Sequence, residues 1–562
     1  AFIVIRGTGP HFTGGALALG RLAVGAVLLG IVVLAGRRWV RPTAREWLLI
    51  VIYGVAWFGA YNVALNIAAH TLDAGTTGVR AIAFDESGST VDLRYREFTQ
   101  HFPRPGWVEH DADEIWSSIV GVTAELIAAL QAPVAAIGIT DQRETVVAWD
   151  RRTGRPLHRA IVWQDRRGAA RCDQLVEEGR LPLVRHTTGL VLDPYFSASK
   201  LEWLFTDGGV EPGPHLALGT IDSWLLWKLT GGEVHATEPS NASRTMLYDI
   251  RAHQWSPELC DLFGVPIDAL GEVRPSSGRF GVTHADSGLP PGIPISGIAG
   301  DQQAALFGQA CFAPGATKNT YGTGSFVLMN VGTTCPEPVE GLLTTVAWTI
   351  PDPAAPGGLR TDYAFEGAIF ATGSAIQWLR DGLGIIERAA DAGPSAASVP
   401  STADGSFAPA FTGPGSPWWD PYARGTLVGV TRGTTEPHLT RAVIEARVFQ
   451  PRDVVGAMTA GSGHAVTGLR ADGGASAMDL LLQLQADQLQ VPVRRPLVQE
   501  TTALGAAYLA GLAEGVWGST DDIETNWALD AEFHPVAPPA DADRTHARWL
   551  EAVDRSRAWS TA

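Results

Sequence analysis

Two short turns rich in glycine and threonine decide the fold of this chain. The first, Asp73-Ala74-Gly75-Thr76-Thr77-Gly78, leads into a short apolar segment, Val79 to Asp85. The second, Asn319-Thr320-Tyr321-Gly322-Thr323-Gly324, leads into the apolar segment Phe326 to Asn330. Glycine lets a backbone approach a phosphate closely, and threonine adds a hydroxyl group. A single turn of this kind is typical of any hairpin. Two in matching contexts predict two similar domains that face one nucleotide.

The sequence around the first turn alternates between strand and helix patterns. Val91 to Thr99 continues as a further strand, and Glu114 to Leu130 has apolar residues at helical spacing. Ala135 to Thr140 follows as a buried type of strand and runs directly into Asp141-Gln142-Arg143-Glu144. Polar residues at the end of a buried strand are where open α/β sheets place their ligands. The pattern predicts an α/β fold with a site at this strand end.

Length and composition exclude several classes of protein. The 562 residues are too many for one core and suggest about three units. The formal charge of −17 argues against a nucleic-acid groove, which needs a basic face. The 4 cysteines are far apart, so neither a zinc site nor a disulfide framework is indicated. No GxxxxGK[ST] string occurs, which argues against a P-loop ATPase.

The first 68 residues differ in kind from the rest. Gly15 to Gly36 and Trp47 to Ala68 are apolar runs of about the 20 residues that a membrane-spanning helix needs, with an arginine-rich loop between them. The positive-inside rule places that loop in the cytosol, so the residues after Ala68 would lie outside the cytosol. The stretch resembles a fragment of a drug/metabolite (EamA-type) transporter. The sequence also begins with Ala1, and we expect a chimeric or mis-joined reading frame with its seam near residues 72–76.

Motifs spread over about 485 residues resemble the glycerol kinases of the FGGY family of carbohydrate kinases. They are found, in chain order, at residues 105–111, 138–145, 161–167, 193–197, 297–308 and 419–425. The resemblance implies two ribonuclease-H-like, actin-like ATPase domains around a nucleotide cleft. Their expected bounds are 69–308 for glycerol and phosphate binding and 309–553 for adenosine binding, preceded by an apolar helical hairpin over residues 1–68. The implied reaction transfers phosphate from ATP to glycerol, with Mg²⁺, in the cytoplasm, in a possible homodimer or homotetramer. Membrane contact is expected only if residues 1–68 are a natural part of the protein.

The resemblance also assigns the side chains that would hold glycerol. Asp301 would be the general base that takes a proton from the glycerol hydroxyl, a role that suits a positioned carboxylate. A small triol carries no charge that could form an ion pair, so hydrogen-bond donors and acceptors of the protein must match each hydroxyl. The residues implied as substrate-binding are Arg143, Glu144, Trp163, Tyr195, Asp301, Gln302 and Phe326.

On the nucleotide side, the resemblance implies that Asp73 holds the magnesium ion through water, as is usual for Mg²⁺. Arg80 would offset charge on the transferred phosphoryl group. The residues implied as phosphate- and adenosine-binding are Gly75, Thr76, Thr77, Arg80, Gly322, Thr323, Gly373, Gln377, Gly474 and Ala475.

This chain departs from the family pattern in its first strand and in one helix. Ala68-Ala69-His70-Thr71-Leu72 contains two polar residues, and a buried one without a partner would cost about 1–3 kcal/mol. Pro451 stands where relatives continue a helix, which places the continuity of that helix in question. The alternatives to a glycerol kinase are another FGGY kinase for a pentulose, gluconate or erythritol, a non-catalytic actin-like nucleotide-binding protein, a membrane transport protein, and a catalytically impaired fusion.

Overall fold

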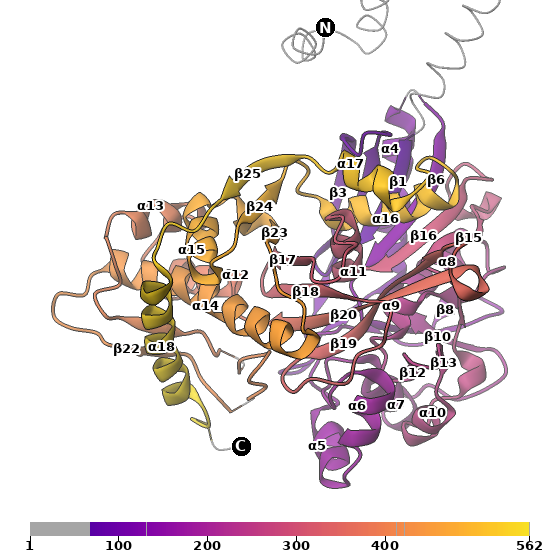
Figure 1. Ribbon diagram of the computed structural model, residues 1–562. Coiled ribbons are helices and arrows are strands. Elements are labelled where there is room, and N and C mark those ends of the chain that lie inside the picture. Colours follow the sequence, from indigo (N-terminus) through magenta and orange to yellow (C-terminus); the bar gives the residue numbers. More distant parts are fainter. Residues whose placement is uncertain (1–67, 131, 412, 421, 561–562) are drawn as a thin grey trace, which may run out of the picture. The chain divides into compact units, whose positions relative to one another are not determined.

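The computed structural model describes residues 68–130, 132–411, 413–420 and 422–560 (Figure 1). The apolar hairpin that the sequence predicts over residues 1–68 lies outside these residues, except for residue 68 itself. Of the helices in the described part, none combines the length and the hydropathy that a bilayer-spanning segment requires.

The first large sheet contains the first glycine-threonine turn. Its six strands lie in the order β15 (Ser277–Val282), β16 (Pro294–Gly300), β6 (Val134–Asp141), β1 (Ala68–Ala74), β2 (Gly78–Phe84) and β3 (Thr90–Glu97). β1 pairs antiparallel with β2 and parallel with β6, and β6 pairs parallel with β16. The turn of residues 75–77 joins β1 to β2 beside the end of β6.

The second large sheet repeats this arrangement. Its strands lie in the order β19 (Leu343–Pro351), β20 (Leu359–Ile369), β18 (Ser325–Gly332), β17 (Thr317–Tyr321), β23 (Leu469–Asp472), β24 (Val493–Pro496) and β25 (Leu529–Phe533). β17 pairs antiparallel with β18 and parallel with β23, which pairs parallel with β24. The order β20-β18-β17-β23-β24 thus matches β3-β2-β1-β6-β16. The two turns occupy equivalent positions, which confirms the predicted repeat.

Smaller sheets and helices complete the described chain. A further sheet has β10 (Leu216–Thr220), β7 (Val146–Asp150), β9 (Ala160–Ile161), β5 (Glu109–His110) and β4 (Gln100–His101), with β8 (Arg155–Pro156) beside β7. The two-stranded pairs are β11 (Ala236–Thr237) with β14 (Glu272–Val273), β12 (Tyr248–Asp249) with β13 (Gln254–Trp255), and β21 (Ser406–Ala408) with β22 (Thr426–Val428). The α-helices are α4 (Ala112–Ala129), α5 (Ala169–Glu177), α6 (Leu181–Thr188), α7 (Ser197–Thr206), α8 (Ile221–Leu229), α9 (Pro239–Ala242), α10 (Pro257–Leu262), α11 (Asp301–Gly308), α12 (Gly373–Gln377), α13 (Ala392–Ala397), α14 (Glu436–Ser462), α15 (Asp479–Leu489), α16 (Thr501–Ala513), α17 (Thr520–Asn526) and α18 (Pro539–Ser556).

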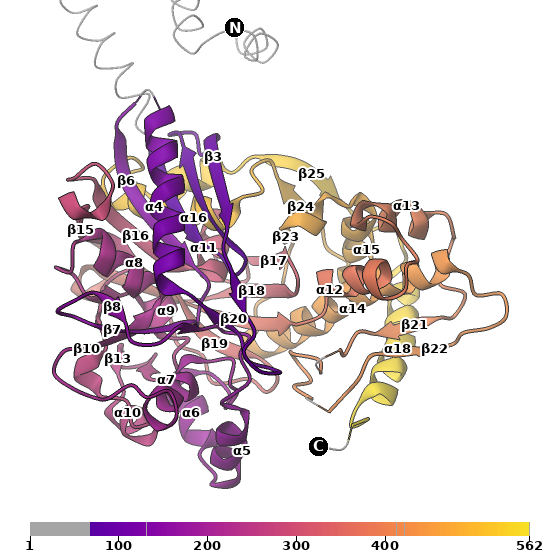
Figure 2. The same cartoon turned by 180° about the vertical axis from the view of Figure 1, so that it is seen from behind.

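Helix α4 shows how the sequence sets these elements. Its first turn is capped by Asp111, whose Oδ1 accepts hydrogen bonds from the backbone N–H groups of Asp113 (2.9 Å) and Glu114 (3.1 Å). The cap explains why the helix begins two residues before the predicted start at Glu114. The buried side chains recur at helical spacing. The helix packs on β2 and β3, and Figure 2 shows its ribbon alongside β3. They include Ile115, Ile119, Val122 and Leu126.

Helix α14 passes through Pro451 without ending. Proline lacks the N–H that would bond to the carbonyl of Arg447, and this loss usually kinks or breaks a helix. Here the surrounding residues Val448 to Pro451 are buried, and α14 packs between α13 and α15. Tertiary packing therefore outweighs the local preference.

Helix α16 links the two halves, because its backbone touches α11 and the first sheet. A Cβ atom on Gly505 would lie 1.8 Å from the carbonyl oxygen of Ala304, and one on Gly308 would lie 2.0 Å from that of Thr501. Both positions therefore require glycine. The same helix, which follows the second sheet in sequence, packs on β1, β6 and β16 of the first.

The first strand contains two buried polar residues, of which one has a hydrogen-bond partner and the other has none. Thr71 donates from Oγ1 to the carbonyl oxygen of Ala503 at 2.6 Å. His70 is buried, and neither ring nitrogen has a hydrogen-bond partner. Because successive side chains of a strand alternate, His70 shares a sheet face with Leu72, which belongs to the apolar core around α4.

We expect His70→Val to raise the free energy of unfolding at pH 7 by about 1–3 kcal/mol, because it removes two buried unpaired polar atoms. Burial also lowers the pKa of His70 to about 4. The unfolded chain therefore binds more protons between pH 6.5 and pH 4, and the wild type loses stability across that window as the pH falls. Urea unfolding at pH 7 and pH 5 measures both effects. A variant less stable than wild type at both pH values would contradict this account.

Candidate active site

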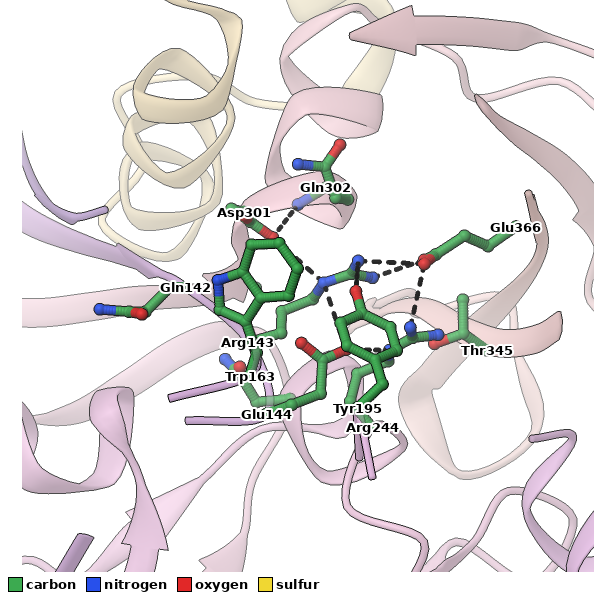
Figure 3. A network of polar contacts seen from close by, with 12 residues as sticks. Gln142, Arg143, Glu144, Trp163, Tyr195, Arg244, Asp301, Gln302, Thr345 and Glu366 are labelled. Carbon is green, nitrogen blue, oxygen red and sulfur yellow. Dashed lines mark hydrogen bonds and ion pairs between the residues drawn. The ribbon is translucent and has the colours of Figure 1, made fainter. Parts of the chain in front are cut away.

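A cluster of polar side chains forms where β6 and β16 end. Arg143 and Glu144 follow β6, and Asp301 begins α11 directly after β16. The two strands are parallel neighbours, so their carboxyl ends meet at one edge of the sheet. Figure 3 shows these side chains pointing toward one another, with Arg143 at the centre.

Arg143 is held by charged partners from two other elements, β20 and α11. Its two terminal nitrogens donate to the carboxylate of Glu366 on β20, at 2.5 and 3.0 Å. Its Nε lies 3.1 Å from Oδ1 of Asp301. Glu366 also accepts a hydrogen bond at 2.9 Å from Arg244, which in turn donates to Glu144 at 2.7 Å. Two guanidiniums and two carboxylates thus form a buried chain of ion pairs, in the order Arg143, Glu366, Arg244 and Glu144. The Asp301 side chain at its edge is partly exposed.

The two carboxyls of this chain differ in their electrostatics. Burial by itself would raise the pKa of Glu366, but the guanidiniums of Arg143 and Arg244 outweigh it and hold that pKa at about 2. Burial raises the pKa of Glu144, and the same two arginines offset only part of the rise. Glu144 also has a φ of 62°, a strained conformation for a residue with a side chain. Such strain persists where the surrounding structure enforces it, often at functional sites.

Asp301 is the carboxylate that a ligand can reach. Its side chain is 33% exposed, whereas that of Arg143 is 1% exposed. The adjacent Gln302 directs its side-chain oxygen to Nζ of Lys318 at 2.6 Å. Lys318 is itself buried, and burial lowers its pKa to about 8. Gln302 is thereby fixed beside Asp301.

Three aromatic rings line the cluster. Trp163 and Tyr195 meet edge to face, with ring centroids 5.6 Å apart. The hydroxyl of Tyr195 accepts from Arg143 at 3.3 Å, and the ring of Phe326 lies 5.9 Å from the guanidinium carbon of Arg143. The structure therefore brings together all the residues that the sequence suggests for a substrate site. It adds Arg244 and Glu366, which sequence reasoning missed.

Of the two residues that sequence reasoning missed, Glu366 could have been found from its position in the sequence. Glu366 stands inside the apolar run of β20, Tyr363 to Ile369, and a carboxylate in such a run needs a buried cation as its partner. The identity of that partner was not readable, because Arg143 and Arg244 are far from Glu366 in sequence.

The first turn lies next to this cluster. Trp163 donates from Nε1 to Oγ1 of Thr76 at 3.0 Å, and Gln142 donates to the carbonyl oxygen of Gly75 at 3.0 Å. Arg80, suggested as a phosphate ligand, pairs with Glu500 at 2.5 Å and lies 3.8 Å from Asp73. Thr77 completes the turn of residues 75–77.

Asp73 is a buried carboxylate whose charged form a bound cation would stabilise. Burial raises its pKa to about 6; Arg80 opposes this, while Glu500 and Asp301 add to it. Burial is the main cause of this rise, and Arg80 offsets only part of it, so a magnesium ion beside Asp73 would stabilise the charged carboxylate further. The described residues contain no group of three or more ligating side chains placed to hold a metal. Mg²⁺ commonly uses one or two carboxylates, with waters and substrate phosphates as the other ligands, so Asp73 fits this mode.

The second turn borders a cavity of about 740 Å³. The loop after Gly473 and α12 also line this cavity, and a Cβ on Gly474 would meet open space. The lining residues include Gly322, Thr323, Gly373, Gln377, Gly474 and Ala475. All six residues suggested for this half of the nucleotide site thus meet in one cavity, and Met478 lines it as well.

We expect Gly373→Ala to weaken ADP binding by about 5- to 150-fold, which corresponds to overpacking by about 1–3 kcal/mol. An added Cβ would lie 2.5 Å from the carbonyl oxygen of Gly322 and would push the second turn out of place. Isothermal titration calorimetry with ADP measures the change. Gly456→Ala on α14 is the matched control, because its Cβ would enter open space outside the cavity lining; equal losses in both variants would refute the packing argument.

Comparisons with known proteins agree with the architecture. The profile of the N-terminal domain of the FGGY family of carbohydrate kinases matches residues 68–308, and that of the C-terminal domain matches residues 317–514. A glycerol kinase of Bordetella parapertussis is 52% identical over 499 residues, which are 87% of this chain and 97% of that protein. One from Carboxydothermus hydrogenoformans is 52% identical over 495 residues, with 87% and 98% covered. The crystal structure of Plasmodium falciparum glycerol kinase with ADP superposes with a TM-score of 0.80 at 32% identity, covering 87% of this chain and 98% of that one.

The fold and the matches together define an actin-like, two-domain kinase with a cluster of buried polar side chains at the strand ends. The chain belongs to the FGGY family of carbohydrate kinases. Residues 1–67 lie outside both matched ranges, and the predicted resemblance of this segment to a transporter fragment finds no support in these matches.

Proposed function

We propose that this protein transfers the terminal phosphoryl group of ATP to glycerol and so forms sn-glycerol 3-phosphate. The observation that carries the proposal is the polar site around Asp301, in which Arg143, Glu144 and Tyr195 are buried and the Asp301 carboxylate is partly exposed. The relatives that share about half of this chain's residues are glycerol kinases, which supports the same substrate.

The chemistry of the site suits a small uncharged polyol. Arg143 offers donors and Glu144 offers an acceptor, while the rings of Trp163 and Phe326 offer apolar surface for carbon atoms. A polyol lacking one hydroxyl would leave a buried group unpaired, so the site would reject it.

In the proposed reaction, the glycerol hydroxyl gives its proton to the Asp301 carboxylate as its oxygen bonds to the γ-phosphorus. The bond between that phosphorus and the bridging oxygen breaks, and ADP leaves with the electron pair. Arg143 keeps the Asp301 carboxylate in place at 3.1 Å, and the turn at residues 75–77 and Arg80 face the phosphates. Asp73 would hold the magnesium ion, which offsets the negative charge of the phosphates when bound.

The runner-up function is phosphorylation of another polyol or of a pentulose by the same machinery. Initial rates of ADP release should therefore be compared with Mg-ATP and equal concentrations of glycerol, erythritol, xylulose and gluconate. We expect the highest kcat/KM for glycerol. A higher value for any of the other three would replace glycerol as the substrate, and ADP release without any of them would indicate an ATPase.

The altered first strand needs its own control. The same assay should be run on the full chain and on a version in which an ordinary apolar strand replaces residues 1–72. Activity in both would show that the unusual N-terminal segment is tolerated. Activity only in the second would identify the full chain as an impaired fusion, and a lack of activity in both folded proteins would reject the proposed reaction.

A further inference from the structure

A fully buried lysine holds the segment that carries Tyr195. Of the 42 lysines and arginines in the chain only 3 are lysines, and two of these, Lys200 and Lys318, are fully buried. Lys318 bonds to Gln302 in the site described above. Lys200, on α7, donates from Nζ to the carbonyl oxygens of residues 194, 195 and 196 at 2.8, 2.6 and 2.8 Å. An ammonium group has three N–H donors, so these bonds use all of them.

The position of Lys200 is unfavourable for the helix to which it belongs. The three carbonyls stand directly before α7, so the ammonium charge lies at the N-terminus of that helix. The helix dipole is positive there and opposes a cation. Burial of an ammonium group adds a further cost. A charge that is placed against both effects points to a role other than stabilising the helix, because local rules are most often broken at functional sites.

The segment that Lys200 holds contacts two side chains of the candidate active site. The hydroxyl of Tyr195 accepts from Arg143 at 3.3 Å, and Figure 3 shows the two side chains together. Ser197 donates from Oγ to the carbonyl oxygen of Glu144 at 3.1 Å. The φ of 62° at Glu144 is strained, and such a conformation needs neighbours that enforce it. Residues 194–197 therefore fix both Tyr195 and the backbone of Glu144.

We propose, on the basis of the proposed kinase function, that Lys200 is a positioning residue that sets the affinity for glycerol by holding Tyr195 and Glu144 in place. Lys200 does not bond the polyol itself, because its three donors are used by main-chain oxygens. Without the ammonium group, three buried carbonyls would lose their shared partner, and the segment would shift to find others. Tyr195 and Glu144 would shift with it.

The surroundings of Lys200 give this role a pH dependence. Burial lowers the pKa of Lys200 to about 8, and Glu144, Asp165, Asp193 and Cys172 oppose the change. Burial raises the pKa of the Cys172 thiol to about 12, so the thiol stays neutral. The three carboxylates are paired, in the same order, with Arg244, Arg167 and Arg166. A neutral amine has only two N–H donors for three carbonyls, so glycerol affinity should fall as the pH rises through 8.

The first test compares Michaelis constants. Lys200→Met keeps the length of the side chain and removes its donors. We expect it to raise KM for glycerol about tenfold, the effect of one buried hydrogen bond, and to leave KM for ATP unchanged, because residues 194–200 do not line the nucleotide cavity. Lys228→Met is the matched control, since Lys228 lies over the ring of Trp224 on α8. Equal rises in both constants, or no rise for glycerol in a folded variant, would overturn the proposal.

The second test measures KM for glycerol between pH 7 and pH 9. Because burial also lowers the pKa of Lys318 to about 8, three proteins are compared. The rise in KM with pH should persist in Lys318→Met and disappear in Lys200→Met. A rise that remains in Lys200→Met would overturn the proposal. In a Tyr195→Phe background, Lys200→Met should cost less than in wild type, and a fully additive cost would assign Lys200 to general stability.

Lys200→Gln is the second variant in case Lys200→Met does not fold, because glutamine keeps two N–H donors without a charge. If neither folds, the pH profiles of wild type and Lys318→Met decide, and a rise that vanishes in Lys318→Met rejects the inference. Calorimetry with glycerol needs no turnover and separates the inference from the proposed function. If glycerol binding depends on Lys200 and no phosphoryl transfer occurs, the inference stands and the proposed reaction falls. If glycerol neither binds nor reacts, both fall.

Discussion

Asp301→Asn is expected to lower kcat for glycerol phosphorylation by about 10²- to 10⁴-fold, the usual contribution of a positioned general base. Asparagine keeps the shape and polarity of the side chain, but it cannot accept the proton of the glycerol hydroxyl. Arg143 remains bound to Glu366 at 2.5 and 3.0 Å, so the geometry of the site should survive the change. ADP affinity should be unaffected, because Asp301 does not line the cavity that holds the second turn.

The measurement is steady-state kinetics with glycerol and Mg-ATP, together with ADP titration and thermal unfolding of each protein. Asp150→Asn is the matched control, since Asp150 forms a surface pair with Arg152 away from the site. A kcat within a factor of about ten of wild type, in a folded Asp301→Asn protein, would remove Asp301 from the role of general base.

The repeat was predictable because it is local in sequence. Each half carries a turn whose residues favour a hairpin between two apolar strands, and strand order then follows from pairing of neighbours. The polar residues after β6 were also readable, because a buried strand that ends in Asp141-Gln142-Arg143-Glu144 has to present them at a sheet edge. The assignment of roles to individual residues came from resemblance and stays a prediction.

What could not be predicted depends on contacts between distant segments. Glu366 is held by Arg143 and Arg244, which lie 223 and 122 residues away in sequence. No local pattern distinguishes Thr71, which finds the carbonyl of Ala503, from His70, which finds no partner. Pro451 has a strong local preference against a helix interior, and packing between α13 and α15 overrides it.

The buried ion-pair network makes a second strong prediction. Glu366→Gln is expected to lower the free energy of unfolding at pH 7 by about 3–5 kcal/mol, because it removes the carboxylate that two buried guanidiniums share. Urea unfolding measures the loss. Removing Asp150, a partner in a surface ion pair, by Asp150→Asn should change stability little, since water screens such pairs. Comparable losses in the two variants would contradict the network argument.

The pH dependence of that loss gives an independent check on its origin. The pKa of Glu366 is held at about 2 in the folded protein and is near 4.5 in the unfolded chain, so the unfolded chain binds the proton first as the pH falls. The contribution of this carboxylate is complete above pH 4.5 and disappears as the pH falls toward 2. Glutamine cannot titrate, so the stability gap between wild type and Glu366→Gln should narrow over that range. A stability difference between the two proteins that stays constant below pH 4.5 would mean that Glu366 stabilises the fold through its shape and hydrogen bonds. Its charge would then contribute nothing to holding Arg143 beside Asp301.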